Sequence, residues 1–75
     1  MSTELGKIKG RYETLKGAEK IKYKENSIYL TSFYGGKKKG LMLQITIDNP
    51  QTTYSQLTKE QANKLINKLN EWLMF

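Results

Sequence analysis

The spacing of apolar residues changes near Leu57 from every second residue to every third or fourth residue. The segment LMLQITI, residues 41–47, alternates apolar and less apolar side chains, which is typical of a half-buried strand. The stretch after Leu57 instead has the spacing of an amphipathic helix. Its apolar stripe consists of Ala62, Leu65, Ile66, Leu69, Trp72 and Leu73. The chain must therefore combine a sheet with one helix near its C-terminus.

The start of this helix has a recognisable capping pattern. Thr58 is placed to cap the helix, and Gln61 three residues later completes a capping box. Leu57, before the cap, is placed to contact Ala62. We therefore predict a helix over residues 58–73.

Upstream segments with period-two alternation predict an antiparallel sheet. The expected strands are residues 7–15, 20–24, 27–34, 41–47 and a short segment at 53–57. Glycine, asparagine and serine favour turns at 15–18, 24–27 and 35–40, and Asn49-Pro50 ends the strand at 41–47. We predict one α+β domain over residues 1–75. It has a four-stranded sheet, or five-stranded with segment 53–57, and the C-terminal helix packs on one face.

The residue types that are absent exclude several kinds of site. The 75 residues include no cysteine and no histidine, so disulfides, thiolate or imidazole metal ligands and a Ser-His triad are excluded. The carboxylates are scattered, and no phosphate-binding or nucleophile motif is present. We expect no enzymatic activity, no metal and no cofactor. Because no apolar run approaches the ~20 residues of a membrane span, and residues 1–10 lack a signal-peptide pattern, we expect a cytoplasmic or nucleoid-associated protein without membrane contact.

The net charge of +6 belongs to the first half of the chain. Residues 1–40 hold ten basic and four acidic residues, whereas residues 41–75 hold three of each. Such an asymmetry favours a field directed toward a polyanion rather than a uniform solubility coat.

The alternation predicts which residues share a face of the sheet. The face toward the helix is expected to hold Ile8, Tyr12, Ile21, Tyr23, Ile28, Leu30, Leu41, Leu43, Ile45 and Ile47. The opposite face is expected to hold Lys7, Lys9, Arg11, Lys20, Lys22, Lys24, Tyr29, Phe33, Met42 and Gln44. Basic and aromatic side chains are thus predicted to lie together, apart from the apolar surface.

This combination is typical of proteins that bind single-stranded nucleic acid. Lysine and arginine neutralise phosphates, and aromatic rings stack on bases with little sequence preference. The loop GGKKKG, with Lys37, Lys38 and Lys39, is predicted to be a basic finger beside that face. We expect a single-stranded DNA or RNA binder with strongly salt-dependent affinity.

Other interpretations of the same residues stay open. The strand lysines are also what a solvated outer face needs to discourage aggregation, and a register shift of one residue would exchange the two faces. A small sheet backed by a helix also resembles double-stranded DNA readers of the integrase-arm type. A small phage or host regulatory protein whose basic face binds an acidic protein partner is the alternative from a different class.

The order of elements resembles a known family. Four antiparallel strands, the joint SQLTKEQANKLINKL at 55–69 and its Leu-Thr-x-Glu-Gln helix start are similar to single-stranded DNA-binding proteins related to transcriptional positive cofactor four and the whirly group. The resemblance implies a curved sheet, dimerisation involving the C-terminal helix, and a basic sheet surface that follows single-stranded DNA. The very short strand at 20–24 and the extra segment at 52–57 depart from the family's pattern.

The C-terminus carries more apolar surface than one helix end usually needs. Trp72, Met74 and Phe75 crowd the last four residues. They are expected either to form a homodimer contact or to fold back on the sheet of the same chain.

Overall fold

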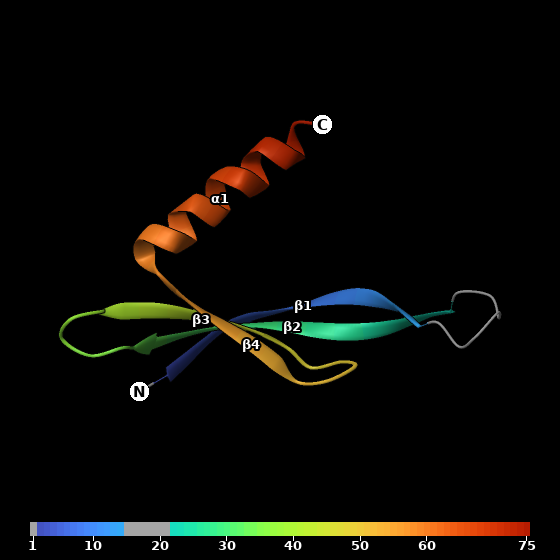
Figure 1. Ribbon diagram of the computed structural model, residues 1–75, viewed down its shortest axis with the longest axis horizontal. Helices are drawn as coiled ribbons and strands as arrows, with labels where there is room; N and C mark the ends of the chain where they lie inside the picture. Colours follow the sequence, from blue (N-terminus) through green and yellow to red (C-terminus); the bar gives the residue numbers. More distant parts are fainter. Residues whose placement is uncertain (1, 15–21) are drawn as a thin grey trace.

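The chain forms a four-stranded antiparallel meander followed by one helix (Figure 1). The computed structural model describes residues 2–14 and 22–75. The elements are β1 (Ser2–Thr14), β2 (Lys22–Tyr34), β3 (Leu41–Ile47), β4 (Thr53–Thr58) and α1 (Lys59–Leu73). Each strand pairs with the next one along the chain, so the order in the sheet is β1-β2-β3-β4. The predicted α+β class is confirmed.

Strand β2 is one continuous strand of 13 residues. The sequence predicts two strands here, at 20–24 and 27–34, separated by a turn at 24–27, and that prediction is wrong. Glu25, Asn26 and Ser27 pair with Arg11, Gly10 and Lys9 of β1. The long neighbouring strand supplies backbone partners to the whole segment, and this outweighs the local turn preference of asparagine and serine.

Strand β1 is also longer than predicted, because it begins at Ser2 instead of residue 7. Its pairing with β2 shifts register between Glu4 and Gly6, which leaves Leu5 as an extra residue in a bulge. The turn predicted at 15–18 lies outside the described residues. The short segment predicted at 53–57 is β4, so the described part of the chain has four strands rather than five.

The loop between β2 and β3 depends on its glycines. Gly35 N–H donates to the Gly40 carbonyl at 2.7 Å, and Gly40 N–H donates to the Gly36 carbonyl at 2.7 Å. Gly36 and Gly40 have φ angles of 99° and 65°, a region that residues with a Cβ rarely adopt. The loop therefore projects Lys37, Lys38 and Lys39 into solvent from a hydrogen-bonded base.

Asp48 fixes the end of β3 against the middle of β2. Its Oδ1 accepts a hydrogen bond from Ser27 N–H at 3.0 Å, and its Oδ2 accepts one from the Tyr29 hydroxyl at 3.4 Å. The Asp48 N–H donates to the Ser27 carbonyl at 3.2 Å, and the Asn49-Pro50 peptide bond that follows is cis. Beyond this point β1 and β2 continue without β3. Residues 9–14 and 22–27 therefore form a two-stranded ribbon that extends past the four-stranded sheet.

The start of α1 matches its prediction. Thr58 N–H donates to Gln61 Oε1 at 2.9 Å, and Thr58 Oγ1 accepts from Gln61 N–H at 3.3 Å, which completes the capping box. Thr58 is both the last residue of β4 and the cap of the helix, so no connecting loop separates the two elements.

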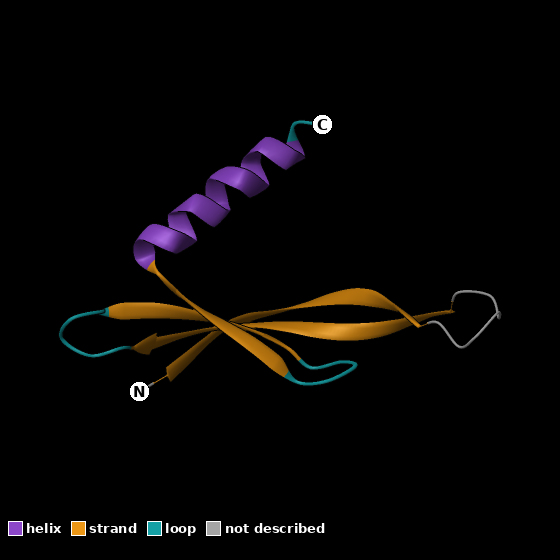
Figure 2. Ribbon diagram, viewed as in Figure 1, coloured by secondary structure: helices purple, strands orange, loops and turns teal. Residues whose placement is uncertain are grey.

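Helix α1 does not lie flat on the sheet. Among the described elements it contacts β3 and β4, and Figure 2 shows it rising away from the strands after its first turns. Ala62 and Leu65 are half-buried, whereas the later residues of the apolar stripe are exposed. The predicted packing on one face is thus limited to the start of the helix, because the loop-free junction does not let the chain turn back.

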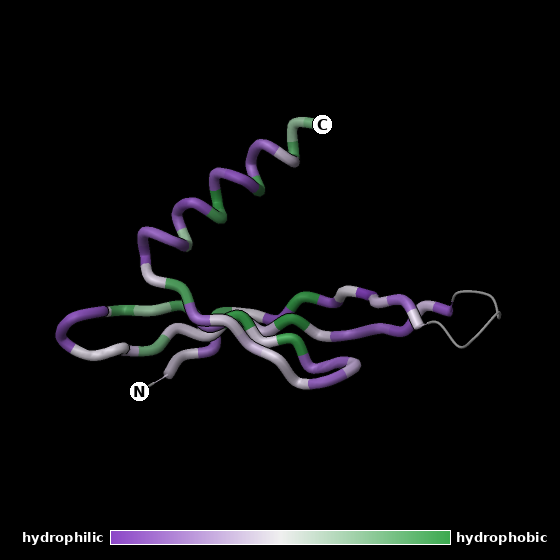
Figure 3. The backbone as a smooth tube through the Cα atoms, in the orientation of Figure 1, coloured by the Kyte–Doolittle hydropathy of each residue, from purple (hydrophilic) through white to green (hydrophobic). Residues whose placement is uncertain are grey.

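The interior of the described chain is small. Met42, at 7 % exposure, is its one buried residue, and no described side chain is fully buried. Figure 3 shows apolar residues gathered in the middle of the sheet and along α1, with hydrophilic stretches in the loop between β2 and β3 and at the Lys22 end of β2. A substantial apolar surface of this chain therefore faces solvent.

Candidate nucleic-acid interface

The strand register determines which side chains share a face, because paired residues point to the same side of a sheet. Lys7, Lys9 and Arg11 of β1 pair with Tyr29, Ser27 and Glu25 of β2. Tyr29 pairs in turn with Thr46, and Thr46 pairs with Tyr54 of β4. We call this side the basic-aromatic face. It carries Lys7, Lys9, Arg11, Tyr23, Tyr29, Phe33, Met42, Gln44 and Tyr54.

Five of the residues predicted to bind nucleic acid are brought together by this register. These are Lys7, Lys9, Arg11, Tyr29 and Phe33. The pairing of β1 with β2 accounts for the grouping, since it places the three basic side chains on alternate residues of an edge strand beside the aromatic row of β2.

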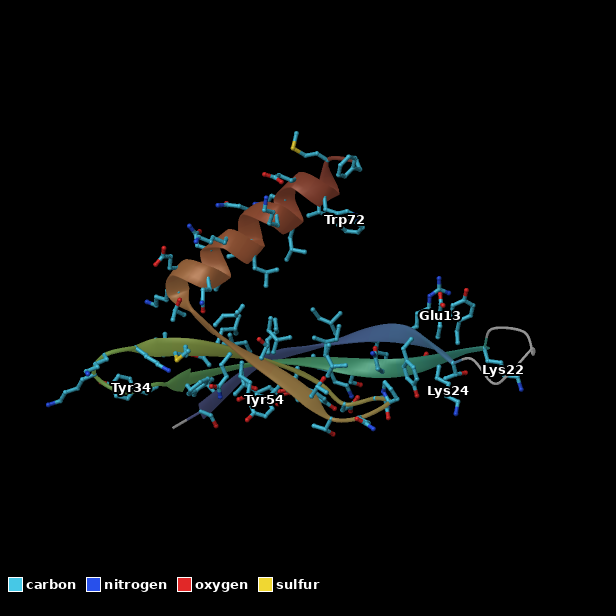
Figure 4. The ribbon with its side chains drawn as sticks, viewed as in Figure 1. Glu13, Lys22, Lys24, Tyr34, Tyr54 and Trp72 are labelled. Carbon is cyan, nitrogen blue, oxygen red and sulfur yellow. The ribbon has the colours of Figure 1, made fainter. Side chains whose placement is uncertain are left out.

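Two predicted residues lie on the other side of the sheet. Lys24 pairs with Tyr12 and Lys22 pairs with Thr14, which puts both lysines on the face that also holds Ile28 and Leu30. Placing Lys22 and Lys24 with Tyr29 was wrong, because the alternation runs unbroken through the continuous strand β2. In Figure 4 both lysines extend from the ribbon on the side opposite to Glu13. Lys20, which was predicted to accompany them, lies outside the described residues.

The same unbroken alternation brings Tyr23 onto the basic-aromatic face, although the sequence pattern assigned it to the apolar face. The Arg11 guanidinium lies 4.4 Å from the centroid of the Tyr23 ring. The Lys7 ammonium lies 5.5 Å from the centroid of the Tyr29 ring. Both distances are within the range of cation–π attraction. Two of the cations on this face thus lie over two of its aromatic rings.

The aromatic residues of this face differ in how much ring they present. Tyr29 is half-buried, with Lys7 over its ring and its hydroxyl bonded to Asp48, and Phe33 is also half-buried. Tyr23 is exposed, and Tyr54 on β4 is 64 % exposed. Tyr54 was not among the predicted residues. The alternation of segment 53–57, which puts Tyr54 and Gln56 on the face opposite to Leu57, could have identified it. Tyr23 and Tyr54 therefore present more ring surface than the two residues that were predicted.

The charge on the basic-aromatic face is mixed. Glu4, Glu13 and Glu25 lie on the same side as the three basic residues, and Glu25 pairs directly with Arg11. In residues 2–14 and 22–75 the one ion pair joins Lys68 Nζ and Glu71 Oε2 at 3.9 Å on the exposed surface of α1. The described basic side chains of the sheet therefore have no carboxylate of residues 2–14 or 22–75 within 4.0 Å.

The lysine loop lies far from the ribbon lysines. Lys37, Lys38 and Lys39 are exposed at one end of β2, and Lys22 and Lys24 are at the other end (Figure 4). At ~3.3 Å per residue, the ends of this 13-residue strand are about 40 Å apart. The loop adjoins the Phe33 end of the basic-aromatic face, whereas Arg11 lies in the ribbon at the other end. The two lysine groups cannot meet the same phosphate.

The predicted oligomer contacts are at the free end of α1. Trp72 is 65 % exposed, and Met74 and Phe75 are more exposed still. They do not fold back on the sheet of the same chain, which was one of the two alternatives for these residues.

Neither a metal centre nor a membrane helix is found in the described part of the chain. Residues 2–14 and 22–75 contain no cluster of three acidic side chains arranged to hold a metal ion. The helix that the structure describes is too short and too polar to cross a membrane.

Comparison with protein-family models, with curated proteins and with solved structures finds no match to this chain. The resemblance to the positive-cofactor-four and whirly group accordingly stays a prediction.

Proposed function

We propose that this protein is a non-enzymatic nucleic-acid-binding protein that holds a single strand on its basic-aromatic face. The observation that carries the proposal is the register of β1 against β2, which sets Lys7, Lys9 and Arg11 beside Tyr29 and Tyr23 on one surface. A surface shaped for solubility alone would need the cations but not the exposed rings.

The spacing of the basic residues suits a polyanion that lies along the edge strand. Alternate residues of a strand are about 6.6 Å apart on one face, so a strand of nucleic acid parallel to β1 meets three cations in succession. Each phosphate that is neutralised releases condensed counterions, which makes such binding favourable at low salt and weak at high salt.

The exposed tyrosines supply the second component of binding. Tyr23 lies on the ribbon and Tyr54 lies on β4, and the register places both rings on the same side of the sheet as the half-buried Tyr29. Base stacking on a tyrosine contributes roughly 1–3 kcal/mol and tolerates any base. Binding is therefore expected to show little sequence preference.

The test is fluorescence anisotropy of a labelled dT oligonucleotide with added protein over a salt series, repeated with unlabelled duplex as competitor. The proposal predicts binding that weakens steeply as salt rises and that duplex competes for poorly. Absence of binding even at 20 mM salt would refute it, and an acidic protein would then become the expected partner of the basic residues.

A second candidate function is favoured by the two-stranded ribbon of residues 9–14 and 22–27. It carries Lys9 and Arg11 on one face and Lys22 and Lys24 on the other, and the major groove of duplex DNA admits a ribbon of this kind. Replacing Lys22 and Lys24 together by glutamine separates the candidates. A single-strand binder that uses the basic-aromatic face keeps most of its affinity, whereas a groove binder loses most of it.

A further inference from the structure

The described chain leaves two complementary apolar surfaces uncovered. One is the stripe of α1 that continues past Leu65, and the other is the face of the sheet toward α1, on which Ile8 and Leu41 are exposed. A domain of this size needs most of its large apolar residues inside, because burial of apolar area is the main term that opposes the loss of chain entropy. The exposed apolar residues are Leu5, Ile8, Leu41, Ile66, Leu69, Trp72, Leu73, Met74 and Phe75.

The two surfaces diverge from a common base. Where α1 leaves the sheet there is an open, apolar pocket of about 160 Å³. Its lining residues are Leu5, Ser32, Leu41, Met42, Leu43, Thr58, Lys59 and Ala62. Figure 4 shows Trp72 at the far end of α1, on the side of the helix that faces the sheet. Among the described residues, no element covers the base of the wedge-shaped space between α1 and the sheet or the far end of the helix.

We propose that a second copy of this chain fills the wedge, with the two α1 helices side by side and antiparallel. A two-fold axis near the middle of α1, at Ile66, brings the C-terminal end of each helix to the base of the wedge in the other copy. Trp72, Met74 and Phe75 of one copy then lie at the pocket that contains Leu41 and Ala62 of its partner.

Three features of the chain favour a second copy over a different protein. Each chain has one uncovered helix stripe and one uncovered sheet face, so a symmetric pair covers both surfaces of both copies. The stripe is uncharged, so two chains of net charge +6 can approach there without placing cations in contact. The helix has 15 residues and is therefore about 22 Å long, so in an antiparallel pair the C-terminal end of each helix can reach the pocket of the other copy.

The available area is sufficient for a stable pair. Aromatic side chains bury 150–250 Å² each, so the largely exposed Trp72 and Phe75 supply roughly 300 Å² per copy. Ile66, Leu69 and Leu73 add the area of three exposed aliphatic side chains. Together with the sheet residues opposite them, these approach the ~800 Å² per partner of a standard interface.

The single tryptophan makes the association measurable on the unmodified protein. We expect a dimeric mass by light scattering at 50 µM and a short-wavelength Trp72 emission that shifts to longer wavelength on dilution as the dimer dissociates. A monomer at 50 µM with folded circular dichroism overturns the proposal, whichever wavelength Trp72 emits. No nucleic acid is present, so the result is independent of the proposed function.

Single cysteines test the antiparallel arrangement, since the natural chain has none. Under mild oxidation Ile66→Cys is expected to form a disulfide with its symmetry mate. Trp72→Cys is expected to form none with itself but to cross-link to Lys59→Cys in a mixture of the two variants. Self-linking of Trp72→Cys without self-linking of Ile66→Cys overturns the antiparallel geometry.

A matched pair of charge variants tests the contact surface. Leu69→Lys places a cation in the apolar stripe, and Asn67→Lys adds the same charge on the opposite side of the helix. The dimer dissociation constant is expected to rise at least 100-fold for Leu69→Lys and to change less than threefold for Asn67→Lys. Equal constants for the two variants would exclude α1 from the interface, and the cysteine experiment decides the matter if Leu69→Lys does not fold.

Discussion

Removing the three cations of β1 should flatten the salt dependence of nucleic-acid binding. The variant combines Lys7→Gln, Lys9→Gln and Arg11→Gln, which keeps the side chains polar and of similar length. Each phosphate contact on a single strand contributes about 0.7 to the slope of log K against log[salt]. If all three residues meet phosphates, the slope should fall in magnitude by about 2.

The triple variant should also bind dT more weakly at low salt. Because counterion release vanishes near 1 M salt, a slope that differs by about 2 corresponds to roughly 100-fold weaker binding at 0.1 M, or about 2.7 kcal/mol. The assay is anisotropy of a labelled dT oligonucleotide at five salt concentrations. Circular dichroism is recorded in parallel, since Arg11 also contacts Tyr23.

The matched control removes the same charge from another surface. Lys59→Gln, Lys64→Gln and Lys68→Gln lower the net charge by the same three units, but these exposed lysines are on α1. The control should leave the slope within about 0.7 of the natural protein, the contribution of one phosphate contact. Equal slopes for the two triple variants would mean that the effect follows net charge alone, and the assignment of the basic-aromatic face would then be wrong.

Three further perturbations test single features of the structure. Tyr54→Ala should weaken dT binding by about 1 kcal/mol or more in the same anisotropy assay. The control is Tyr34→Ala, which removes a similarly exposed ring (61 % against 64 %) from the other face of the sheet. This control variant should bind dT as the natural protein does. Asp48→Ala leaves the partly buried Ser27 N–H without its side-chain acceptor and should lower the free energy of unfolding by about 1–3 kcal/mol in urea titrations. Thr58→Ala removes the helix cap and should cost about 1 kcal/mol, measured at one fixed protein concentration because association contributes to stability.

The elements whose signals are local could be predicted from the sequence. Residues 41–47 form a strand as their alternation indicates, and the helix begins where Thr58 and Gln61 place its cap. Both signals depend on residues within six positions of each other, so no distant part of the chain is needed to interpret them.

The side of the sheet on which Lys22, Tyr23 and Lys24 lie could not be predicted in the same way. Asparagine and serine at 26 and 27 indicate a turn, and a turn there would restart the alternation. In the folded chain β1 pairs with residues 22–33 of β2, so the alternation continues and these three residues lie on the face opposite to the predicted one. Backbone pairing with a distant strand outweighs a local turn preference because every unpaired group in that segment would lose a hydrogen bond.

The sequence by itself determined the α+β order of elements, the concentration of positive charge in the first 40 residues, and the apolar stripe of the helix. The tertiary structure decided the composition of the basic-aromatic face, the separation of the lysine loop from the ribbon lysines, and the direction of α1. The first group follows from the chemistry of neighbouring residues. The second group follows from strand register and from the loop-free junction at Thr58, which depend on how distant segments meet.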